Sequence, residues 1–475
     1  MELPRSFEGA DALPVDAVPP AVRAAALASR NSGEPVGGYL YDLAAAKERA
    51  ESLVRALPSR VKVFYAVKAN SFPPLLAALA EILHGFEVAS VSEANLAIAA
   101  TRKAATHSAA AAHGAAPHGA APHGAAPHGA APHGAAPHGA AAHGAAVVEA
   151  PPVGPSATGG RMVVSGPGKN SAMLAGLLAL EHPLTINVES LLELHRLSRA
   201  AVATGRHAPG REVPVALRVN PERSPVRIDH AHGLTMGGLP SPFGIPEPEI
   251  PAAIRAVGSL PGVDFVGFHL HAVSGNMDAD LHAEYVRGAV DWAVRTADEH
   301  GLHLRTIDVG GGLGIPFEPG PEFDITAFGA ALEPPEGVEL VLEPGRWMAG
   351  PIGWYATEVV DVKRAYGEAF VVVRGGINHF QLPTSWEIRH NFAVVPIDDW
   401  PVGLPRPVVE RERVTVCGEL CTPEDVLARD VTVERVRAGD LLIFPNAGAY
   451  GFEFAMPAFL GQPPAWRTAL IRPRG

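Results

Sequence analysis

The stretch VFYAVKAN, Val63–Asn70, joins a strand-like apolar run to a single lysine. The first residues of this run are aromatic or β-branched, as in a buried strand, and Lys68 closes it. A lone lysine at the end of a strand is usually just solvated, so Lys68 alone assigns no chemistry. What it does depends on the residues that follow the other strands of the chain.

Composition limits the classes of protein to consider. The chain has 475 residues, with 38 Lys and Arg against 50 Asp and Glu, for a net charge of −12. This length predicts two or three domains, and the acidic balance argues against a nucleic-acid partner. No apolar run reaches about 18 residues, and the N-terminus lacks the features of a signal peptide. With Cys417 and Cys421 as the only cysteines, we expect a cytoplasmic protein without a membrane partner.

One segment departs from the rest of the chain. From about His107 to Ala146 the sequence repeats H-G-A-A-P, a period that fits neither helix nor strand. We interpret residues 104–157 as a disordered, low-complexity insertion rich in His, Ala, Gly and Pro. The alternative is a flexible metal-binding tract, because neutral imidazoles are good metal ligands. Nothing nearby organises such ligands, so we predict no metal site.

Outside that insertion, short apolar strands alternate with helical stretches. The expected strands are residues 61–67, 85–90, 161–165, 183–188, 214–220, 263–272, 306–310 and 339–343. The expected helices between them are 74–83, 92–100, 170–180, 190–203, 248–257 and 279–299. Near-continuous apolar strands separated by helices predict a parallel sheet. Eight such units favour an α/β fold of the (β/α)8 TIM-barrel type, with a doubly wound sheet as the alternative.

The sequence pattern changes after Arg346. Runs such as RVTVCGEL and DVTVERVRAGDLLIF carry β-branched residues with turns between them and little helical periodicity. They predict a second, mainly antiparallel β domain. Near the N-terminus, GGYLYDL reads as a further strand, and a helix is expected from about residue 44 to 57. We therefore expect a barrel over 44–345 and a β domain built from 1–43 and 346–475.

The unusual residues fall at the carboxyl ends of the predicted strands. Lys68 follows the first, His271 and Ser274 the sixth, Gly310–Gly312 the seventh, and Glu343 and Arg346 the eighth. In a barrel these ends converge on one face, where active sites lie. Each residue has an ordinary structural explanation when taken alone. The glycines also lack the last Gly of a dinucleotide-binding G-x-G-x-x-G loop.

Taken together, these residue types point to pyridoxal 5'-phosphate (PLP). A glycine loop lets backbone N–H groups approach an anion, and the guanidinium of Arg346 suits a phosphate. A lysine desolvated at a strand end can lose its proton and form a Schiff base with an aldehyde. The carboxylate of Glu343 would keep a pyridine nitrogen protonated.

The combination resembles the fold-type III PLP-dependent decarboxylases, the ornithine and diaminopimelate decarboxylase family. The motifs FYAVKAN, HLHAVSGN, DVGGGLG, EPGR, CGELCTPEDVLARD and NAGAYG occur in the order of that family. The resemblance runs from about Gly38 to the C-terminus, apart from the insertion. It implies an alanine-racemase-like PLP barrel with a C-terminal β domain. Alanine racemase itself pairs the ring nitrogen with an arginine, whereas Glu343 stands here, which favours decarboxylation.

The resemblance also implies roles for individual residues. Lys68 would bind PLP covalently, His271 would stack on the ring, and Glu343 would pair with the pyridine nitrogen. The phosphate would be held by Ser274, Gly310, Gly311, Gly312, Gly345, Arg346 and Tyr450. After CO2 leaves, Cys421 would return a proton, with Thr422 and Asp425 lining the substrate site. In this family the cysteine loop reaches the neighbouring subunit, so a homodimer with shared active sites is implied. A C-x3-C metal half-site at Cys417 and Cys421 is the alternative.

Three positions bear on the amino-acid substrate. Diaminopimelate decarboxylases usually carry Arg and Tyr in the stretch matching GGINHFQLPTSW, and Glu after the cysteine, but this chain has Leu382, Trp386 and Thr422. Ornithine decarboxylases also have an acidic residue after the cysteine. The chain thus looks more like the branch that decarboxylates siderophore precursors or other specialised amino acids. The alternatives are a diaminopimelate decarboxylase, a racemase or dehydratase on the same barrel, and a catalytically inactive binding protein.

Overall fold

Eight parallel strands close into a barrel in the computed structural model. It describes residues 10–30, 35–114, 160–222, 234–235, 237–238, 240–318, 320–383, 386, 388 and 390–471. The barrel strands are β3 (Val61–Ala66), β4 (Gly85–Val88), β5 (Arg161–Val164), β6 (Leu184–Val188), β7 (Val213–Asn220), β10 (Val263–His269), β12 (Thr306–Asp308) and β13 (Glu339–Leu342). They pair in that order, and β13 returns to β3. The predicted (β/α)8 barrel is confirmed, and the doubly wound alternative is wrong.

Strand β3 shows how the barrel strands are buried on both faces. Phe64 belongs to a small interior cluster with Val163 of β5 and Val341 of β13. Its neighbours Val63 and Tyr65 belong to the larger core that includes the surrounding helices. Because successive side chains point to opposite faces of a strand, a strand buried on both sides must be apolar throughout. This explains the continuous apolar run that ends at Lys68.

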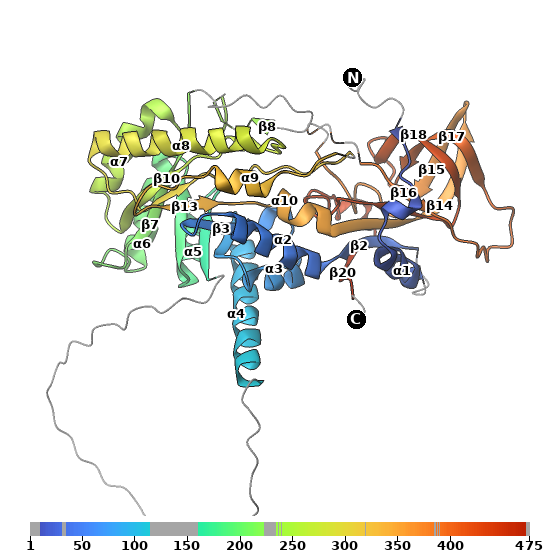
Figure 1. Ribbon diagram of the computed structural model, residues 1–475, viewed down its shortest axis with the longest axis horizontal. Helices are drawn as coiled ribbons and strands as arrows, with labels where there is room; N and C mark the ends of the chain where they lie inside the picture. The colour runs from blue at the N-terminus through green and yellow to red at the C-terminus, as the bar shows by residue number, and fades with distance from the viewer. Residues whose placement is uncertain are drawn as a thin grey trace, which may run out of the picture.

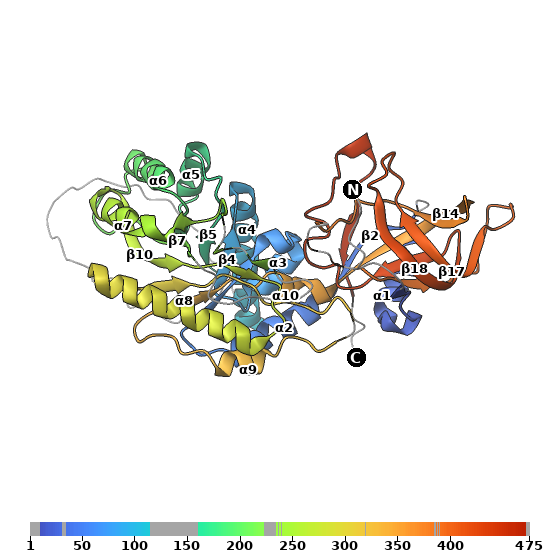
Figure 2. The same cartoon turned by 90° about the horizontal axis from the view of Figure 1, so that it is seen from above.

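Helices surround the barrel (Figures 1 and 2). They are α2 (Leu43–Ala56), α3 (Pro73–Ala80), α4 (Val91–Gly114), α5 (Ser171–Ala179), α6 (Leu191–Ala203), α7 (Ile250–Ser259), α8 (Ala279–His300), α9 (Ile325–Ala330) and α10 (Arg346–Ala349). Short 3-10 segments are η2 (Val15–Ala17), η4 (Val67–Ala69), η5 (Glu247–Glu249), η6 (Gly350–Ile352) and η8 (Phe459–Gly461). Side chains cap several helices, and Asp42, Asn170 and Ser190 each accept a backbone N–H of the first turn.

Helix α4 is longer than the sequence pattern indicated. It continues to Gly114, past the start of the expected insertion at residue 104, and extends away from the barrel in Figure 1. The residues of this extension include an alanine run, and alanine is the strongest helix former. Residues 115–157 of the expected insertion, with most of its histidine repeats, lie outside the described residues.

A second, nine-stranded sheet lies beside the barrel (Figure 2). Its strands are β1 (Ala10–Asp11), β2 (Gly37–Tyr41), β14 (Gly353–Ala365), β15 (Glu368–Val373), β16 (Ala393–Val395), β17 (Val408–Cys417), β18 (Val426–Arg437), β19 (Leu441–Phe444) and β20 (Trp466–Ala469). Strand β14 pairs antiparallel with β2, β15 and β19, while β15–β17, β2–β20 and β1–β18 are parallel. Helix α1 (Pro20–Ser29) packs near β2. The sheet is mainly antiparallel, as expected.

Three further short strands lie near the barrel. Strand β9 (Ile245–Pro246) pairs with β7, and β8 (Leu234–Thr235) pairs with β11 (Val273–Ser274).

Within the described part of the chain, no helix is both long and apolar enough to cross a membrane.

Candidate active site

One pocket lies at the carboxyl ends of the barrel strands. Nine of the ten residues expected to bind the cofactor line it, together with Ala66 and Leu313: Lys68, His271, Ser274, Gly311, Gly312, Glu343, Gly345, Arg346 and Tyr450. The tenth, Gly310, lies against His271, where an added Cβ would be 2.2 Å from Nδ1 of that ring. Residues from five separate stretches of sequence therefore meet, because parallel strands end on the same face of the barrel.

Lys68 faces a carboxylate that the sequence analysis did not single out. The 3-10 turn η4 follows β3 and directs the Lys68 ammonium to Glu87 of β4, with Nζ 2.8 Å from Oε2. Desolvation by the surrounding atoms lowers the pKa of Lys68, although 42% of its side chain is exposed. The carboxylates of Glu87 and Glu343 raise the pKa more, so the net direction is upward. Lys68 is thus a cation in the cofactor-free protein, which differs from the proton-free amine expected. The available signal was a glutamate inside the otherwise apolar GFEV strand.

The glycine loop after β12 brings backbone close to the pocket. Gly310 and Gly312 have φ angles of 69° and 112°, a region that favours glycine. A Cβ at Gly311 would lie 2.5 Å from the carbonyl oxygen of Glu343. Side chains are therefore excluded at all three positions, because neighbouring protein atoms already fill the space that a Cβ would take. Gly311 and Gly312 line the pocket without side chains.

Arg346 is a buried cation among aromatic rings. It is 7% exposed, and its guanidinium carbon lies 4.4 Å from the ring centroid of Trp386 and 5.0 Å from that of Tyr450. Its Nη1 has no hydrogen-bond acceptor among the described residues. Tyr450 itself has a φ of 66°, which is rare for a bulky residue and common at functional sites. A desolvated guanidinium without an acceptor is suited to bind an anion.

Glu343 is a buried carboxyl group with one oxygen that has no partner among the described residues. It is 4% exposed, and its Oε1 has no hydrogen-bond partner among the described residues. Oε2 lies 3.9 Å from Nε2 of His269. Burial raises the pKa of Glu343, and the nearby carboxylates of Asp308 and Glu87 raise it further. Within the pocket, Oε1 of Glu343 is therefore available to accept a hydrogen bond from a positively charged N–H group.

The side chains and backbone groups of this pocket fit PLP. The Arg346 guanidinium and the glycine backbone suit a phosphate, Lys68 suits an aldehyde, and Glu343 suits a protonated pyridine nitrogen. His271, whose Nδ1 also has no partner among the described residues, lines the same pocket and offers a ring face.

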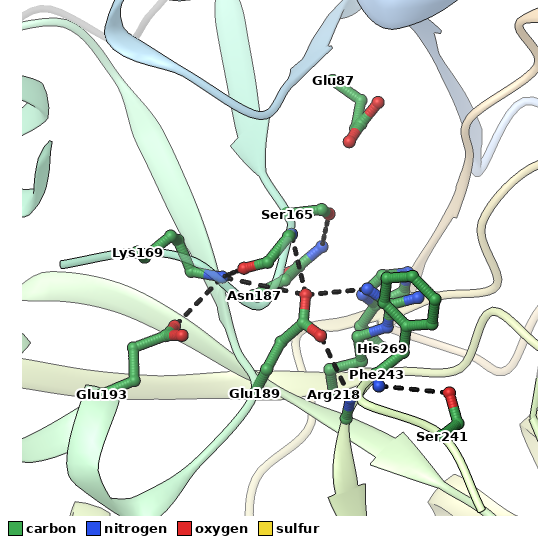
Figure 3. A network of polar contacts seen from close by, with 12 residues as sticks. Glu87, Ser165, Lys169, Asn187, Glu189, Glu193, Arg218, Ser241, Phe243 and His269 are labelled. Atoms are coloured by element: carbon green, nitrogen blue, oxygen red, sulfur yellow. Dashed lines mark hydrogen bonds and ion pairs between the residues drawn. The ribbon is translucent and has the colours of Figure 1, made fainter.

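A buried ionic network supports the side of the barrel next to the pocket (Figure 3). Glu189 lies between Lys169 and Arg218, with Oε1 at 3.8 Å from the Lys169 ammonium and 2.7 Å from Nη1 of Arg218. The Lys169 ammonium also lies 3.1 Å from Glu193. Burial, and then the charge of Arg218, lower the pKa values of His269 and His271. Both imidazoles are therefore neutral. The network was not predicted because its members come from different elements: Lys169 follows β5, Glu189 follows β6, Glu193 lies on α6 and Arg218 on β7.

The expected proton donor Cys421 and the expected substrate residues Thr422 and Asp425 do not line this pocket. Cys421 is exposed, and Thr422 bonds to the side chain of Glu424. Asp425 is buried, and its two carboxylate oxygens accept backbone N–H groups of Ile377 and Leu420 at 2.7 Å each. Asp425 thus braces the cysteine-bearing loop in this structure. Cys417 ends β17, and burial raises the pKa of its thiol.

The loop is braced a second time by Arg374. Its Nη1 lies 2.6 Å and 2.5 Å from the two carboxylate oxygens of Glu419, two residues before Cys421. One guanidinium nitrogen thus contacts both oxygens of the carboxylate in a charge-assisted pair. The cysteine is therefore presented outward by an ordered loop, outside the pocket of its own chain.

Comparisons with known proteins agree with this site. The pyridoxal-dependent decarboxylase family, C-terminal sheet domain, matches residues 39–448. The 2-[(L-alanin-3-ylcarbamoyl)methyl]-2-hydroxybutanedioate decarboxylase of Staphylococcus aureus is 30% identical over 90% of this chain and 92% of that protein. The L-glutamyl-[BtrI acyl-carrier protein] decarboxylase of Niallia circulans is 31% identical over 64% of this chain and 70% of that protein.

Diaminopimelate decarboxylases are related as well. That of Aquifex aeolicus is 28% identical over 91% of this chain and 86% of that protein. The crystal structure of diaminopimelate decarboxylase from Helicobacter pylori complexed with L-lysine covers 94% of each chain, with a TM-score of 0.68 at 20% identity. At that identity the likeness shows a shared fold.

Proposed function

The chain belongs to the pyridoxal-dependent decarboxylase family, and we propose that it decarboxylates an amino acid conjugated to a carboxylate-rich group, in siderophore or other specialised metabolism. It is a PLP-dependent carboxy-lyase. The observation that carries the proposal is one pocket that Lys68, Glu343 and Arg346 line together. Lys68 brings an ammonium group, and Glu343 Oε1 and Arg346 Nη1 have no partner among the described residues. The finer choice of substrate is supported by the S. aureus relative, whose name describes an alanine unit joined through a carbamoyl group to a hydroxybutanedioate.

We assign the cofactor contacts as follows. Lys68 would form the covalent link, and the glycine loop with Ser274, Gly345, Arg346 and Tyr450 would hold the phosphate. His271 offers its ring face, and Glu343 accepts the pyridinium N–H. When bound, PLP supplies an electron sink for the electron pair that stays behind when CO2 departs. The neutral state of His271 leaves the stacking face uncharged.

Two groups of this chain handle protons in the proposed reaction. Glu87, 2.8 Å from the Lys68 ammonium, stabilises the protonated lysine, which must lose this proton before it can bond to the cofactor. Cys421 is the proposed donor of the proton that replaces CO2 on the product. Its exposed position, away from the pocket of its own chain, supports delivery of the thiol to a neighbouring subunit.

A homodimer with shared active sites therefore accompanies the proposal. Exposed apolar side chains follow the pocket residue Tyr450 in sequence: Phe454, Met456, Phe459 and Leu460. An apolar exposed segment beside the pocket suits burial against a second copy. We further propose domain boundaries at 44–345 for the barrel and 1–43 with 346–475 for the β domain, since each sheet stays within one of these units. A cytoplasmic location is supported by the two free thiols.

The substrate proposal also rests on side chains near the site. Trp386 stacks on Arg346 and packs edge-on against Tyr450, with ring centroids 5.2 Å apart. It therefore offers an apolar surface where the resemblance would place a charged or polar partner in diaminopimelate decarboxylases. Thr422 replaces the acidic residue expected after the cysteine. A substrate with a distal ammonium group would lack its usual partner here.

Mass spectrometry of reaction products tests this function. The PLP-loaded protein is incubated with meso-diaminopimelate, ornithine, arginine and citrate-conjugated diamino acids. We expect loss of one CO2 from a citrate-conjugated diamino acid. Turnover of meso-diaminopimelate instead would make the interpretation of Leu382, Trp386 and Thr422 wrong and assign the protein to lysine synthesis. Racemised or dehydrated product with its carboxylate retained would contradict decarboxylation.

A further inference from the structure

A second carboxyl group stands directly beside the proposed partner of the pyridine nitrogen. Asp308 is the last residue of β12, and Glu343 follows the end of the neighbouring strand β13. The two strands pair in register, Asp308 opposite Val341, and the backbone N–H of Glu343 donates to Gly310 at 2.8 Å. A carboxylate oxygen of each residue and a ring nitrogen of His269 lie within 4.8 Å of one another.

The hydrogen bonds of these two carboxyls differ. Asp308 accepts the backbone N–H of Gly310 at Oδ1, at 2.9 Å, and Asn187 Nδ2 at Oδ2, at 3.1 Å. The same Asn187 nitrogen lies 3.1 Å from Ser165 Oγ, which fixes the amide in the barrel interior. Glu343 Oε1 has no donor among the described residues. Two ionised carboxylates so close and so buried would repel strongly, whereas one shared proton removes the repulsion.

We propose that Asp308 is a positioning residue for Glu343, and that the two carboxyls share one proton in the cofactor-free protein and transfer it to the ring nitrogen of the incoming cofactor. Before transfer the pair carries one negative charge. Afterwards both carboxylates are ionised and face a pyridinium cation, so the charge of the site is unchanged. No electrons move, and no further reactant is needed. The inference rests on the cofactor and is independent of the substrate.

The charged groups around the pair are compatible with this proton. Lys68, in the turn after β3, is held by Glu87 of β4. The charges of both side chains act on Glu343. Burial, followed by the charge of Arg218, keeps His269 neutral, so the imidazole carries no extra proton to donate. Tyr285 of α8 donates its hydroxyl to the backbone carbonyl of Leu270. Burial raises the pKa of Asp308 and, more strongly, that of Glu343.

Infrared difference spectroscopy tests the shared proton directly. The C=O stretching band of a protonated carboxyl is recorded at pH 7.5 in the cofactor-free protein and again after addition of PLP. We expect a band that disappears when PLP binds. In Asp308→Asn that PLP-sensitive band should be absent, and PLP should bind about tenfold more weakly because one negative charge near the pyridinium is lost. Neither readout requires turnover.

A matched control comes from Glu193, another buried carboxyl, whose pKa is raised to about 7 by burial. It does not line the pocket. Glu193→Gln should therefore reduce the carboxyl absorption while leaving the PLP-sensitive part unchanged. Should Asp308→Asn fail to fold, Asn187→Ala removes one donor to Asp308 and should move the loss of the wild-type band to higher pH.

Three results would overturn the inference. The first is a cofactor-free wild-type protein without any PLP-sensitive carboxyl band. The second is an Asp308→Asn variant that keeps the wild-type band and PLP affinity. The third is a stoichiometric metal ion in the purified cofactor-free protein that is lost in Asp308→Asn, which would mean that His269, Asp308 and Glu343 bind a cation in place of a proton.

Discussion

The ammonium of Lys68 lies 2.8 Å from Oε2 of Glu87, a carboxylate with no exposed surface. The lysine proposed to bond to the cofactor is therefore held as a cation in the cofactor-free protein. The pair also fixes where the side chain points, because Glu87 stands on the strand next to β3. Cofactor attachment must break this ion pair and remove one proton.

Replacing Glu87 by Gln should speed cofactor attachment at neutral pH. Since Glu87 raises the pKa of Lys68, its removal lowers that pKa and increases the fraction of neutral amine. One pKa unit corresponds to about tenfold in attachment rate at pH 7, and the advantage should shrink as pH rises. The rate is followed by the absorbance of the bound cofactor. Glu81→Gln, which removes the surface pair with Lys47, is the control. Slower attachment would show instead that Glu87 serves as the base.

Replacing Arg346 by Gln should weaken phosphate binding selectively. Charge-assisted hydrogen bonds contribute about 1.5–3 kcal/mol each, so PLP affinity should fall by about 10- to 100-fold. Affinity for pyridoxal, which lacks the phosphate, should change little. Arg467→Gln is the matched control, because that guanidinium also lies over an aromatic ring, Phe452 at 4.0 Å, but outside the pocket. Equal losses for PLP and pyridoxal would contradict a phosphate role.

Cofactor-free protein should lose stability on acidification in part through His282. This ring is fully buried behind Gly312, and burial lowers its pKa from 6.5 to about 4. The unfolded chain therefore binds more protons between pH 6.5 and 4, so stability falls as pH decreases through that window. The His282 contribution lost between pH 7.5 and pH 5 is about 2 kcal/mol. Urea unfolding of His282→Phe should show a correspondingly weaker pH dependence. An unchanged pH dependence would argue against a neutral buried imidazole.

Mixing two inactive variants should restore activity if the active site is shared. Lys68→Ala removes the cofactor link, and Cys421→Ala removes the proposed proton donor. After subunits redistribute, half of the dimers are mixed, and each mixed dimer contains one complete site, giving about a quarter of wild-type activity. Light scattering establishes the oligomeric state in parallel. A monomer, or mixtures that stay inactive after exchange, would contradict a shared site.

Replacing Lys169 by Met should destabilise the barrel. The Lys169 side chain is 1% exposed and lies between Glu189 and Glu193. Its loss leaves the buried Glu193 without its counter-ion, whereas Glu189 keeps Arg218. Breaking a buried ion pair in this way costs about 3–5 kcal/mol. Lys47→Met, at the partly exposed pair with Glu81, should cost less than about 1 kcal/mol. The free energies of unfolding in urea measure both. Equal losses of unfolding free energy for the two variants would mean that burial of the network adds nothing to stability.

Local sequence pattern predicted the barrel strands because each is short, apolar and bounded by turns. Strand periodicity depends on near neighbours, so β3 and β13 can be recognised without knowing that they pair. Helix α4 was misjudged where composition suggested repeats but an alanine run continued the helix to Gly114. The positions of Lys68, Glu343 and Arg346 at strand ends also indicated the cofactor chemistry, because the ends of parallel barrel strands share one face.

The sequence by itself determined the eight-stranded barrel, the mainly antiparallel sheet and the residue types of the pocket, since these follow from local periodicity and from the rule that parallel strands end together. Only the tertiary structure decided the charge states. Glu87 reaches Lys68, Asp308 reaches Glu343, and Arg218 reaches Glu189 between neighbouring strands of the closed barrel. Protonation depends on distance and desolvation, and both are set only when the barrel closes and brings these side chains together at the ends of its strands.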